Sequence, residues 1–252
     1  MTFFHDTWII FARSMRLSLR QPLWVLIGLL QPILYLTLFG PLLQNIAASS
    51  GFQGDAWQVF VPGLLVQLGI FGGLFVGFGI IAEIRSGVID RQLVTPAARA
   101  SIVAGRTLRD VVVITVQGIV LVGAAFALGL RVPVGALLIA LVLVALLGAA
   151  FSFISNAIGI ATKSEDALAP LVNTLALPIL LLSGILLPMN LAPRWLQIAS
   201  DFNPFKHIVE ALRAVFRSDF GNPIIWIGIL LAVVLVVIGA WLGTRTLAAQ
   251  TR

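Results

Sequence analysis

Six long apolar stretches without a charged residue constrain the fold of this chain more than any other feature. They cover residues 23–43, 57–82, 111–130, 135–161, 167–188 and 224–243. A helix needs about 20 mostly apolar residues to cross the hydrocarbon layer of a membrane, and the backbone groups inside that layer must be hydrogen-bonded within their own segment. The pattern therefore predicts an all-α membrane protein with six transmembrane helices in a single domain.

The composition agrees with this prediction. Of the 252 residues, 60% are hydrophobic and only 10% are charged, whereas an average soluble domain carries about 25% charged residues. Such a chain cannot cover a surface that faces water. Its net charge of +6 comes from arginines that flank the apolar stretches. This pattern is typical of membrane topology and of attraction to anionic lipids, and no nucleic-acid partner is expected.

The lysines and arginines also predict the orientation. With six spans, both termini and the loop over residues 83–110 lie on one side of the membrane, and that side holds 11 of the 16 Lys and Arg residues. Loops on the cytoplasmic side carry the excess of positive charge. We therefore expect a multi-pass protein of the cytoplasmic membrane with both termini in the cytoplasm.

Residues 1–21 are expected to form an amphipathic helix in the membrane interface, ahead of the first span. Its apolar face consists of Phe4, Trp8, Ala12, Met15 and Leu19. Arg13, Arg16 and Arg20 lie on another face, which is the pattern of a helix that lies along a membrane surface. The helix is either a simple anchor or also a contact surface for a partner protein.

Three glycines in the second span, Gly69, Gly73 and Gly77, repeat every four residues. Small residues at this spacing let two helix backbones approach each other closely. Helix packing within the chain and a subunit interface both explain the pattern, and no sequence feature separates the two.

Residues 189–223 are too apolar for an open loop, yet too charged and too often interrupted by proline to span the membrane. Asn203-Pro204 divides them into two short helical pieces, residues 193–200 and 205–217. At about 1.5 Å per residue, neither piece crosses about 30 Å of hydrocarbon. We expect an external re-entrant segment of two half-helices that dip into the outer leaflet or lie on it.

Several kinds of chemistry lack their residues in this sequence. There is no GxxxxGK[ST] phosphate loop, so we expect no ATP hydrolysis by this chain. The chain has no cysteine, and His5 and His207 are predicted on opposite sides of the membrane, so we expect no metal site. No acid, base and nucleophile gather on one side, which argues against an enzyme acting on lipid-linked substrates. We expect a chain that is not an enzyme and binds no cofactor of its own.

The centres of the predicted spans carry no Asp, Glu, Lys or Arg. Ion-coupled carriers commonly use such groups inside the membrane, so their absence argues against a self-powered secondary carrier or channel, which stays the main alternative. Small polar residues in the fourth and fifth spans are candidates to line a path for an amphipathic solute. They are Ser152, Ser155, Asn156, Asn173, Ser183 and Gly184. Hydrogen bonding between helices explains these residues equally well.

A short charged segment over residues 83–96, EIRSGVIDRQLVTP, separates the second and third spans. Its four charged residues are Glu83, Arg85, Asp90 and Arg91. A topology signal needs only positive charge and does not explain the two acids. Mixed charge on a short helix that ends at Pro96 favours a surface that docks into another protein.

Two segments of the chain resemble the ABC-2 type transporter permeases. The loop EIRSGVIDRQLVTPAARASIVAGRTLRDV is similar to the first intracellular loop of that family, and its matching features are Glu83, Arg85, Gly87, Asp90, Arg91, the LVTP run and Gly105-Arg106. The segment LLSGILLPMNLAPRWLQIASDFNPFKHIVEALRAVF is similar to the C-terminal signature of the family. Its matching residues are Ser183, Gly184, Pro188, Pro193, Trp195, Leu196, Gln197, Asn203, Pro204, Ala211, Leu212 and Arg213. The chain looks most like the antibiotic-resistance branch typified by the daunorubicin exporter.

The resemblance implies the membrane half of an exporter. Two such chains, identical or homologous, pair with two cytoplasmic ATPase subunits that bind ATP and Mg, and closure of those subunits drives out an amphipathic substrate. The residues implied in ATPase coupling are Glu83, Arg85, Gly87, Asp90, Arg91, Pro96, Arg13 and Arg16, the last two facing either the ATPase or lipid headgroups. The resemblance implies that residues 193–217 close the outer end of the pathway. The candidates for the pathway or gate in and before this segment are Ser183, Gly184, Pro188, Trp195, Asn203 and Pro204.

The sequence does not identify the class of substrate. Relatives with similar motifs handle amphipathic drugs, glycolipids and polysaccharide chains, so the resemblance predicts efflux without choosing among these classes.

Overall fold

The computed structural model describes residues 3–20, 22–50, 55–95, 98–185, 189 and 192–249. These residues are mainly helical, with no strand among them, which confirms the all-α prediction. The helices are α1 (Phe3–Arg20), α2 (Pro22–Ser50), α3 (Ala56–Leu74), α4 (Val76–Arg85), α5 (Val88–Leu93), α6 (Arg99–Ala127), α7 (Val134–Thr162), α8 (Glu165–Leu182), α9 (Arg194–Asp201), α10 (Pro204–Phe216) and α11 (Ile224–Ala249).

Six segments of the described chain are long and apolar enough to cross a membrane, as predicted. They are Val25–Gln44, Ala56–Arg85, Arg99–Ala127, Val134–Thr162, Glu165–Leu182 and Ile224–Leu247. The second of these consists of α3 and α4 together. The amphipathic helix α1 precedes them, so the chain is a multi-pass membrane protein.

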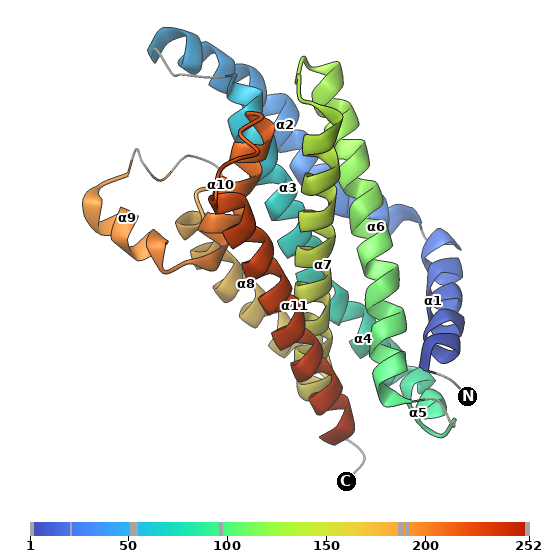
Figure 1. Cartoon of the computed structure of the whole chain (residues 1–252). Helices are drawn as coiled ribbons and strands as arrows, with labels where there is room; N and C mark the ends of the chain where they lie inside the picture. Colours follow the sequence, from blue (N-terminus) through green and yellow to red (C-terminus); the bar gives the residue numbers. More distant parts are fainter. Residues whose placement is uncertain are drawn as a thin grey trace.

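Helix α7 lies at the centre of the bundle and packs against α3, α6 and α11 (Figure 1). Most of α3 is buried, whereas fewer than a quarter of the residues in the apolar stretches of α2, α8 and α11 are buried. The first turn of α1, α5 and the last turn of α11 lie at one end of the bundle, called the termini end below. Helices α9 and α10 lie at the opposite end, called the far end (Figure 1).

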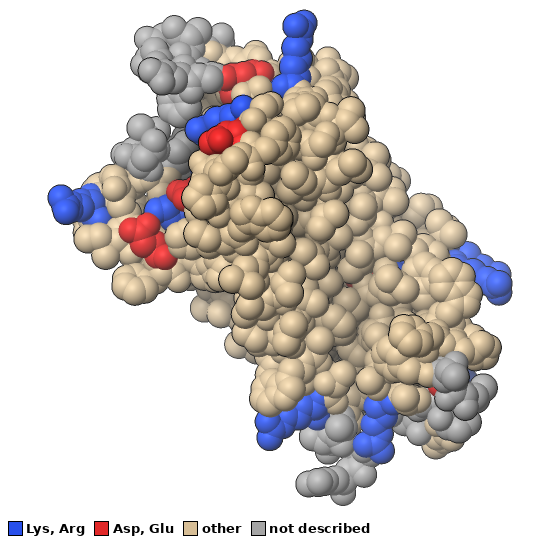
Figure 2. Space-filling view, viewed as in Figure 1, with Lys and Arg blue, Asp and Glu red and all other residues tan. Residues whose placement is uncertain are grey.

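Charged side chains lie mainly at the two ends of the bundle on the face shown in Figure 2. A broad uncharged band separates them on that face. This is the surface expected of a protein whose middle contacts hydrocarbon, because exposed charge is costly there.

The glycines of the second span pack against α7. A Cβ atom added at Gly73 would lie 2.6 Å from the Cβ of Phe151, and one added at Gly77 would lie 2.5 Å from the Oγ of Ser155. Gly69 faces Leu147 in the same way, at 3.0 Å. Only a residue without a side chain permits such close approach. Of the two explanations for the glycine pattern, the structure supports helix packing within the chain.

The helix of the third span begins earlier than the charge pattern suggests. Helix α6 starts at Arg99, whereas the charge-free stretch starts only at residue 111. The intervening residues contain no proline, and the helix simply continues through them. Arg106 and Asp110, which fall in the expected loop over residues 83–110, are therefore helical and buried. Partners from α4 and α7 make this burial tolerable.

The two predicted half-helices before the last span are present as α9 and α10. Asn203 caps α10 by accepting a hydrogen bond from the backbone N–H of Phe205 at 3.0 Å. Pro204 occupies the first turn, where its missing N–H has no consequence for the helix. Helix α10 is largely buried and contacts α11, α3 and α7, so this segment is part of the packed bundle.

Candidate functional site

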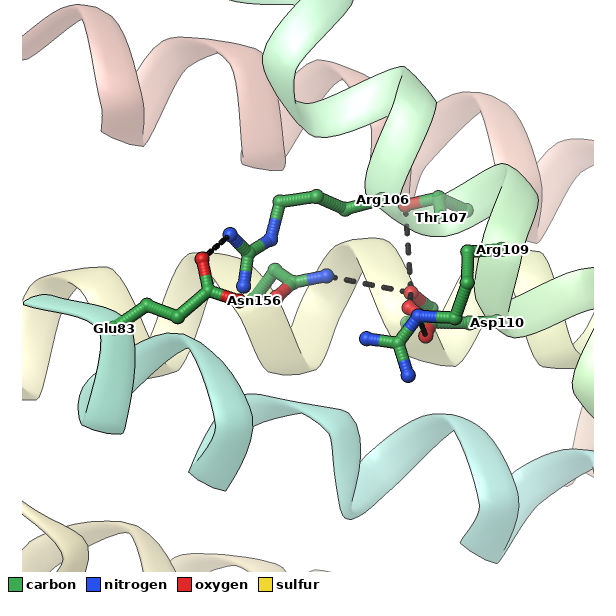
Figure 3. Close-up of polar contacts among 7 residues, drawn as sticks. Glu83, Arg106, Thr107, Arg109, Asp110 and Asn156 are labelled. Carbon is green, nitrogen blue, oxygen red and sulfur yellow. Dashed lines mark hydrogen bonds and ion pairs between the residues drawn. The ribbon is translucent and has the colours of Figure 1, made fainter. Parts of the chain in front are cut away.

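A network of buried polar side chains joins α4, α6 and α7 toward the termini end (Figure 3). Arg106 of α6 forms a hydrogen-bonded ion pair with Glu83 in the last turn of α4. The Arg106 side chain is 3% exposed and that of Glu83 is 28% exposed. Removing one partner of a buried pair leaves an uncompensated charge, which costs about 3–5 kcal/mol. This contact therefore joins the end of α4 to α6.

Asp110 extends the network from α6 to α7. Its carboxylate accepts a hydrogen bond from the Oγ of Ser152 at 2.6 Å, and its Oδ1 lies 3.0 Å from the Nε of Arg109. The Nδ2 of Asn156 donates to the Oγ of Ser152 at 3.3 Å. The hydroxyl oxygens of Thr107 and Ser152 are also 3.3 Å apart (Figure 3). Most of these polar groups, which would be costly alone in an apolar bundle, are thus paired, although the Nε of Arg106 and the Oδ1 of Asn156 form no hydrogen bond among the described residues.

Helical spacing places these side chains together. Arg106 and Asp110 are four residues apart on α6, and Ser152 and Asn156 are four residues apart on α7. Residues at this spacing share one face of a helix. The two faces meet inside the bundle, and Glu83 closes the network from α4.

The same part of α4 is also tied to α8 and leads directly into α5. The Nη1 of Arg85 lies 2.9 Å from the Oε1 of Glu165, at the start of α8. Gly87 then turns the chain into α5 with a φ of +69°, a backbone conformation that favours glycine. A displacement of α5 would therefore reach α6, α7 and α8 through side-chain contacts.

A break in the second span separates α4 from α3. The helix is interrupted at Phe75. The hydroxyl of Ser155 on α7 accepts a hydrogen bond from the backbone N–H of Gly77 at 2.9 Å and donates one to the carbonyl of Leu74. Buried backbone groups need such partners. Ser155 therefore stabilises a joint between the charged end of this span and its buried part.

A second buried arginine, Arg213 of α10, lies at the far end. Its Nε donates to the carbonyl of Val59 on α3 at 3.0 Å, and its Nη2 donates to the carbonyl of Gly184 after α8 at 2.7 Å. Among the described residues, Arg213 forms no ion pair with an acidic side chain. Burial, with a contribution from Arg217, lowers the pKa of Arg213 to about 10, so the side chain stays charged at neutral pH.

The turn after α8 is shaped for this contact. Gly184 has a φ of +70°, which places its carbonyl within reach of Arg213. A Cβ atom added at Gly63 of α3 would lie only 2.1 Å from the carbonyl oxygen of Ile185. Glycine at both positions lets the turn lie directly on α3, and Arg213 fastens α10 to both.

Comparison with known proteins identifies the family. The sequence model of the ABC-2 type transporter family matches residues 5–216 of the chain. This chain belongs to the ABC-2 type transporter family. It is therefore the membrane subunit of an ABC transporter, and its family implies separate ABC ATPase subunits as partners.

The similar proteins include named permeases. A transport permease of Cyanophora paradoxa is 28% identical over 220 residues, which cover 86% of this chain and 76% of the relative. The daunorubicin resistance ABC transporter permease protein of Streptomyces coeruleorubidus is 26% identical over 215 residues, covering 83% of this chain and 74% of the relative. A doxorubicin resistance ABC transporter permease protein of Mycobacterium tuberculosis is 24% identical over 208 residues, covering 82% and 74%.

The residues implied in ATPase coupling lie on two separate parts of this ABC-2 permease. Glu83, Arg85 and Gly87 lie together at the junction of α4 and α5, and Arg91 is exposed on α5. Pro96 and the side chain of Asp90 lie outside the described residues. Arg13 and Arg16 are exposed on α1, which packs on α6. Of these residues, only Glu83 belongs to the network; Arg85 pairs with Glu165 instead, and the α1 arginines lie apart from it.

The residues suggested for a pathway or gate fall into three groups. Ser152, Ser155, Asn156 and Ser183 are buried, and the first three hydrogen-bond between helices or within the network, as the alternative explanation proposed. Asn173 and Trp195 are exposed, on α8 and α9. Gly184, Asn203 and Pro204 shape the turn after α8 and the start of α10. Pro188 lies outside the described residues. Contact of any of them with substrate stays a prediction.

Sequence reasoning assigned no role to Arg106, Asp110 or Arg213. Two signals could have found them. Arg106 and Arg213 belong to the two segments that resemble the family, and Arg106 and Asp110 stand four residues apart just before an apolar stretch. A charged pair on one helix face at the border of a span is placed to be buried with partners from other helices.

Proposed function

We propose that this permease exports an amphipathic drug or lipid-like substrate across the cytoplasmic membrane, powered by two ATPase subunits that bind its termini end. The observation that carries the proposal is the buried network of Glu83, Arg106, Asp110 and Ser152, which joins the charged segment before α6 to three helices of the bundle. The relatives named for daunorubicin and doxorubicin resistance support a drug-like substrate.

The proposed coupling surface is residues 83–96, with the termini end in the cytoplasm, as the distribution of Lys and Arg predicts. The ATPase subunits bind ATP and Mg and contact α5, including Asp90 and Arg91. When they close, α5 and the end of α4 move together. The ion pair of Glu83 with Arg106 then carries this movement to α6, and the hydrogen bond of Asp110 with Ser152 carries it to α7.

The break at Phe75 confines the proposed movement to α4 and leaves α3 in place. Helix α3 is buried against α7 and α6, so it cannot follow α4 without disturbing the core. The joint that Ser155 stabilises allows α4 to tilt while α3 stays in place. Helix interruptions of this kind are where a packed bundle changes conformation at low cost.

The exposed faces of α2 and α8 support pairing with a second permease. Gln31 and Thr37 on α2 and Asn173 and Thr174 on α8 are exposed within their spans. The exposed part of α11, by contrast, carries no polar side chain between Trp226 and Trp241. Polar side chains facing lipid are unfavourable. We therefore place the partner permease and the substrate path against α2 and α8, and lipid against α11.

Transport in proteoliposomes tests the proposal. The permease and its ATPase are reconstituted together, and export of daunorubicin is followed by its fluorescence. We expect ATP-dependent export, and we expect the double charge reversal Asp90→Lys with Arg91→Glu to abolish it without affecting membrane insertion. Charge reversal at Arg194 and Asp219, which are exposed at the far end, also leaves the net charge unchanged; it is the matched control and should leave export largely intact.

Two results would overturn the proposal. Daunorubicin transport driven by an ion gradient, by the chain without any ATPase, would favour a self-powered carrier. Full ATP-dependent export by the Asp90→Lys, Arg91→Glu variant would remove the coupling role of α5.

A further inference from the structure

Helix α1 presents three distinct faces, and the first fixes it to the bundle. Ile10 and Asp6 are buried. A Cβ atom added at Gly105 of α6 would lie 2.7 Å from the carbonyl oxygen of Thr7 and 2.9 Å from the Cβ of Ile10. The glycine lets the two helices touch, so α1 has a defined position on α6 and its other faces point in fixed directions.

The second face of α1 is apolar and uncovered. Phe4 is 82% exposed, Trp8 is 63% exposed and Leu19 is 72% exposed. The rings of Phe4 and Trp8 contact only neighbouring rings of α1 itself, those of Phe3 and Phe11, among the described ring contacts. Because α1 leads straight into the first span, this face is placed to enter the boundary between headgroups and acyl chains.

The third face carries Arg13, Arg16 and Arg20, all of them exposed. Within the described part of the chain, none of the three is ion-paired with a carboxylate. The acid of α1, Asp6, is buried and lies near His5 instead. The arginines lie beside Trp8, Ile9 and Leu17 on the open outer surface of the same helix. Three guanidinium groups are thus next to aliphatic and aromatic side chains.

We propose that this arginine face of α1, defined by Arg13, Arg16 and Arg20, is a binding site for the headgroup of an anionic phospholipid. Guanidinium groups form paired hydrogen bonds to phosphate oxygens. The acyl chains of the same lipid lie against the apolar side chains beside the arginines and against the uncovered second face. A single amphiphilic, negatively charged molecule therefore satisfies both faces at once.

A docked soluble protein explains the two faces less well. Such a protein would need an acidic surface to match the arginines. It would also leave Phe4, Trp8 and Leu19 without an apolar environment, unless the membrane already surrounds these side chains. The lipid site is independent of the proposed export function, since it concerns α1 and the membrane whatever the bundle transports.

Lipid retention by the purified full chain tests the site. The chain is exposed in detergent to equal amounts of phosphatidylglycerol and phosphatidylcholine, and the lipid that it retains is measured by native mass spectrometry. We expect selective retention of phosphatidylglycerol. In the variant Arg13→Gln, Arg16→Gln, Arg20→Gln, this preference should fall by about tenfold or more, because three basic contacts are lost together.

The far end supplies a matched control. Arg131, Arg194 and Arg217 are also exposed, so their replacement by Gln removes the same charge, yet it should leave the preference for phosphatidylglycerol unchanged. The single variants Arg13→Gln, Arg16→Gln and Arg20→Gln should each lower the preference by a smaller step. They keep the test valid if the triple variant does not fold.

Three outcomes contradict the site. The unmodified chain could retain both lipids equally, or the triple variant could retain phosphatidylglycerol as well as the unmodified chain does. A triple variant that keeps its lipid preference but no longer binds the ATPase would assign the arginine face to the protein partner instead.

Discussion

Two buried arginines hold the two ends of this bundle in different ways. Arg106 pairs with the carboxylate of Glu83, which is partly exposed and sits on α4 beside the proposed coupling helix. Arg213 donates to two backbone carbonyls in the interior and pairs with no acidic side chain among the described residues. The carboxylate of the first pair has access to water, whereas the Arg213 guanidinium is held by two interior carbonyls. Together with the proposed coupling role of α5, this difference leads us to expect that the termini end moves during transport and that the far end stays in place.

The largest effect is expected from removing the far-end contact. Arg213→Met loses two hydrogen bonds from a charged donor, each worth about 1.5–3 kcal/mol, so the free energy of unfolding should fall by roughly 3 kcal/mol or more. Thermal unfolding of the purified chain in detergent measures this. Arg213→Lys keeps the charge but lacks the branched guanidinium group that reaches both carbonyls. Its unfolding temperature should lie between those of Arg213→Met and the unmodified chain. If Arg213→Met unfolds at the same temperature as the unmodified chain, the holding role is wrong.

The two halves of the Glu83–Arg106 pair should differ in their effects. Glu83→Gln leaves the deeply buried Arg106 unpaired and should cost about 3 kcal/mol. Arg106→Gln leaves Glu83, which has some access to water, and should cost less. The double variant Glu83→Gln, Arg106→Gln should lose less free energy of unfolding than Glu83→Gln alone, because no unpaired charge is left. Equal costs for the two single variants would contradict the asymmetry of burial on which the comparison rests.

A smaller effect is expected at the joint between α3 and α4. Ser155→Ala removes the partner of the Gly77 N–H and of the Leu74 carbonyl, at about 1–3 kcal/mol for buried groups left unsatisfied. The matched control is Ser183→Ala, because Ser183 is equally buried but donates to a carbonyl of its own helix. Unfolding in denaturant should show a larger loss for Ser155→Ala than for the control.

The smallest effect is expected at the exposed ion pair on the same part of α4. The side chains of Arg85 and Glu165 are 55% and 42% exposed, and such pairs contribute about 0–1 kcal/mol. Arg85→Gln should therefore change the unfolding temperature little, and less at high salt. A loss as large as that of Glu83→Gln would show that exposure does not distinguish these two pairs.

Much of the fold could be predicted because it depends on local patterns. Charge-free stretches locate the spans, and Asn203-Pro204 locates the division between α9 and α10, since an asparagine cap and a proline in the first turn act within a few residues. The glycine repeat predicted close helix contact, but its partner helix could not be named. Small residues specify how close a neighbour comes and not which neighbour it is.

The candidate site could be predicted only in part. The segment over residues 83–96 stood out by its mixed charge, whereas the partners of Glu83 and Arg85 come from residues far along the chain, Arg106 and Glu165. The sequence did not decide whether Ser152 and Asn156 line a substrate path or form hydrogen bonds between helices, because a small polar side chain suits both roles. The neighbouring helix decides between the two roles, and a single sequence does not specify how its helices pack.

In the proposed mechanism, the Glu83–Arg106 pair transmits the action of the ATPase to the bundle. The most direct measurement is the number of substrate molecules exported per ATP hydrolysed, in proteoliposomes that hold the complete complex. For Glu83→Gln we predict that this ratio falls clearly below that of the unmodified complex while ATP hydrolysis continues, because the end of α4 is no longer ion-paired with α6. An unchanged ratio in Glu83→Gln, in a variant that assembles with its ATPase, would contradict the account.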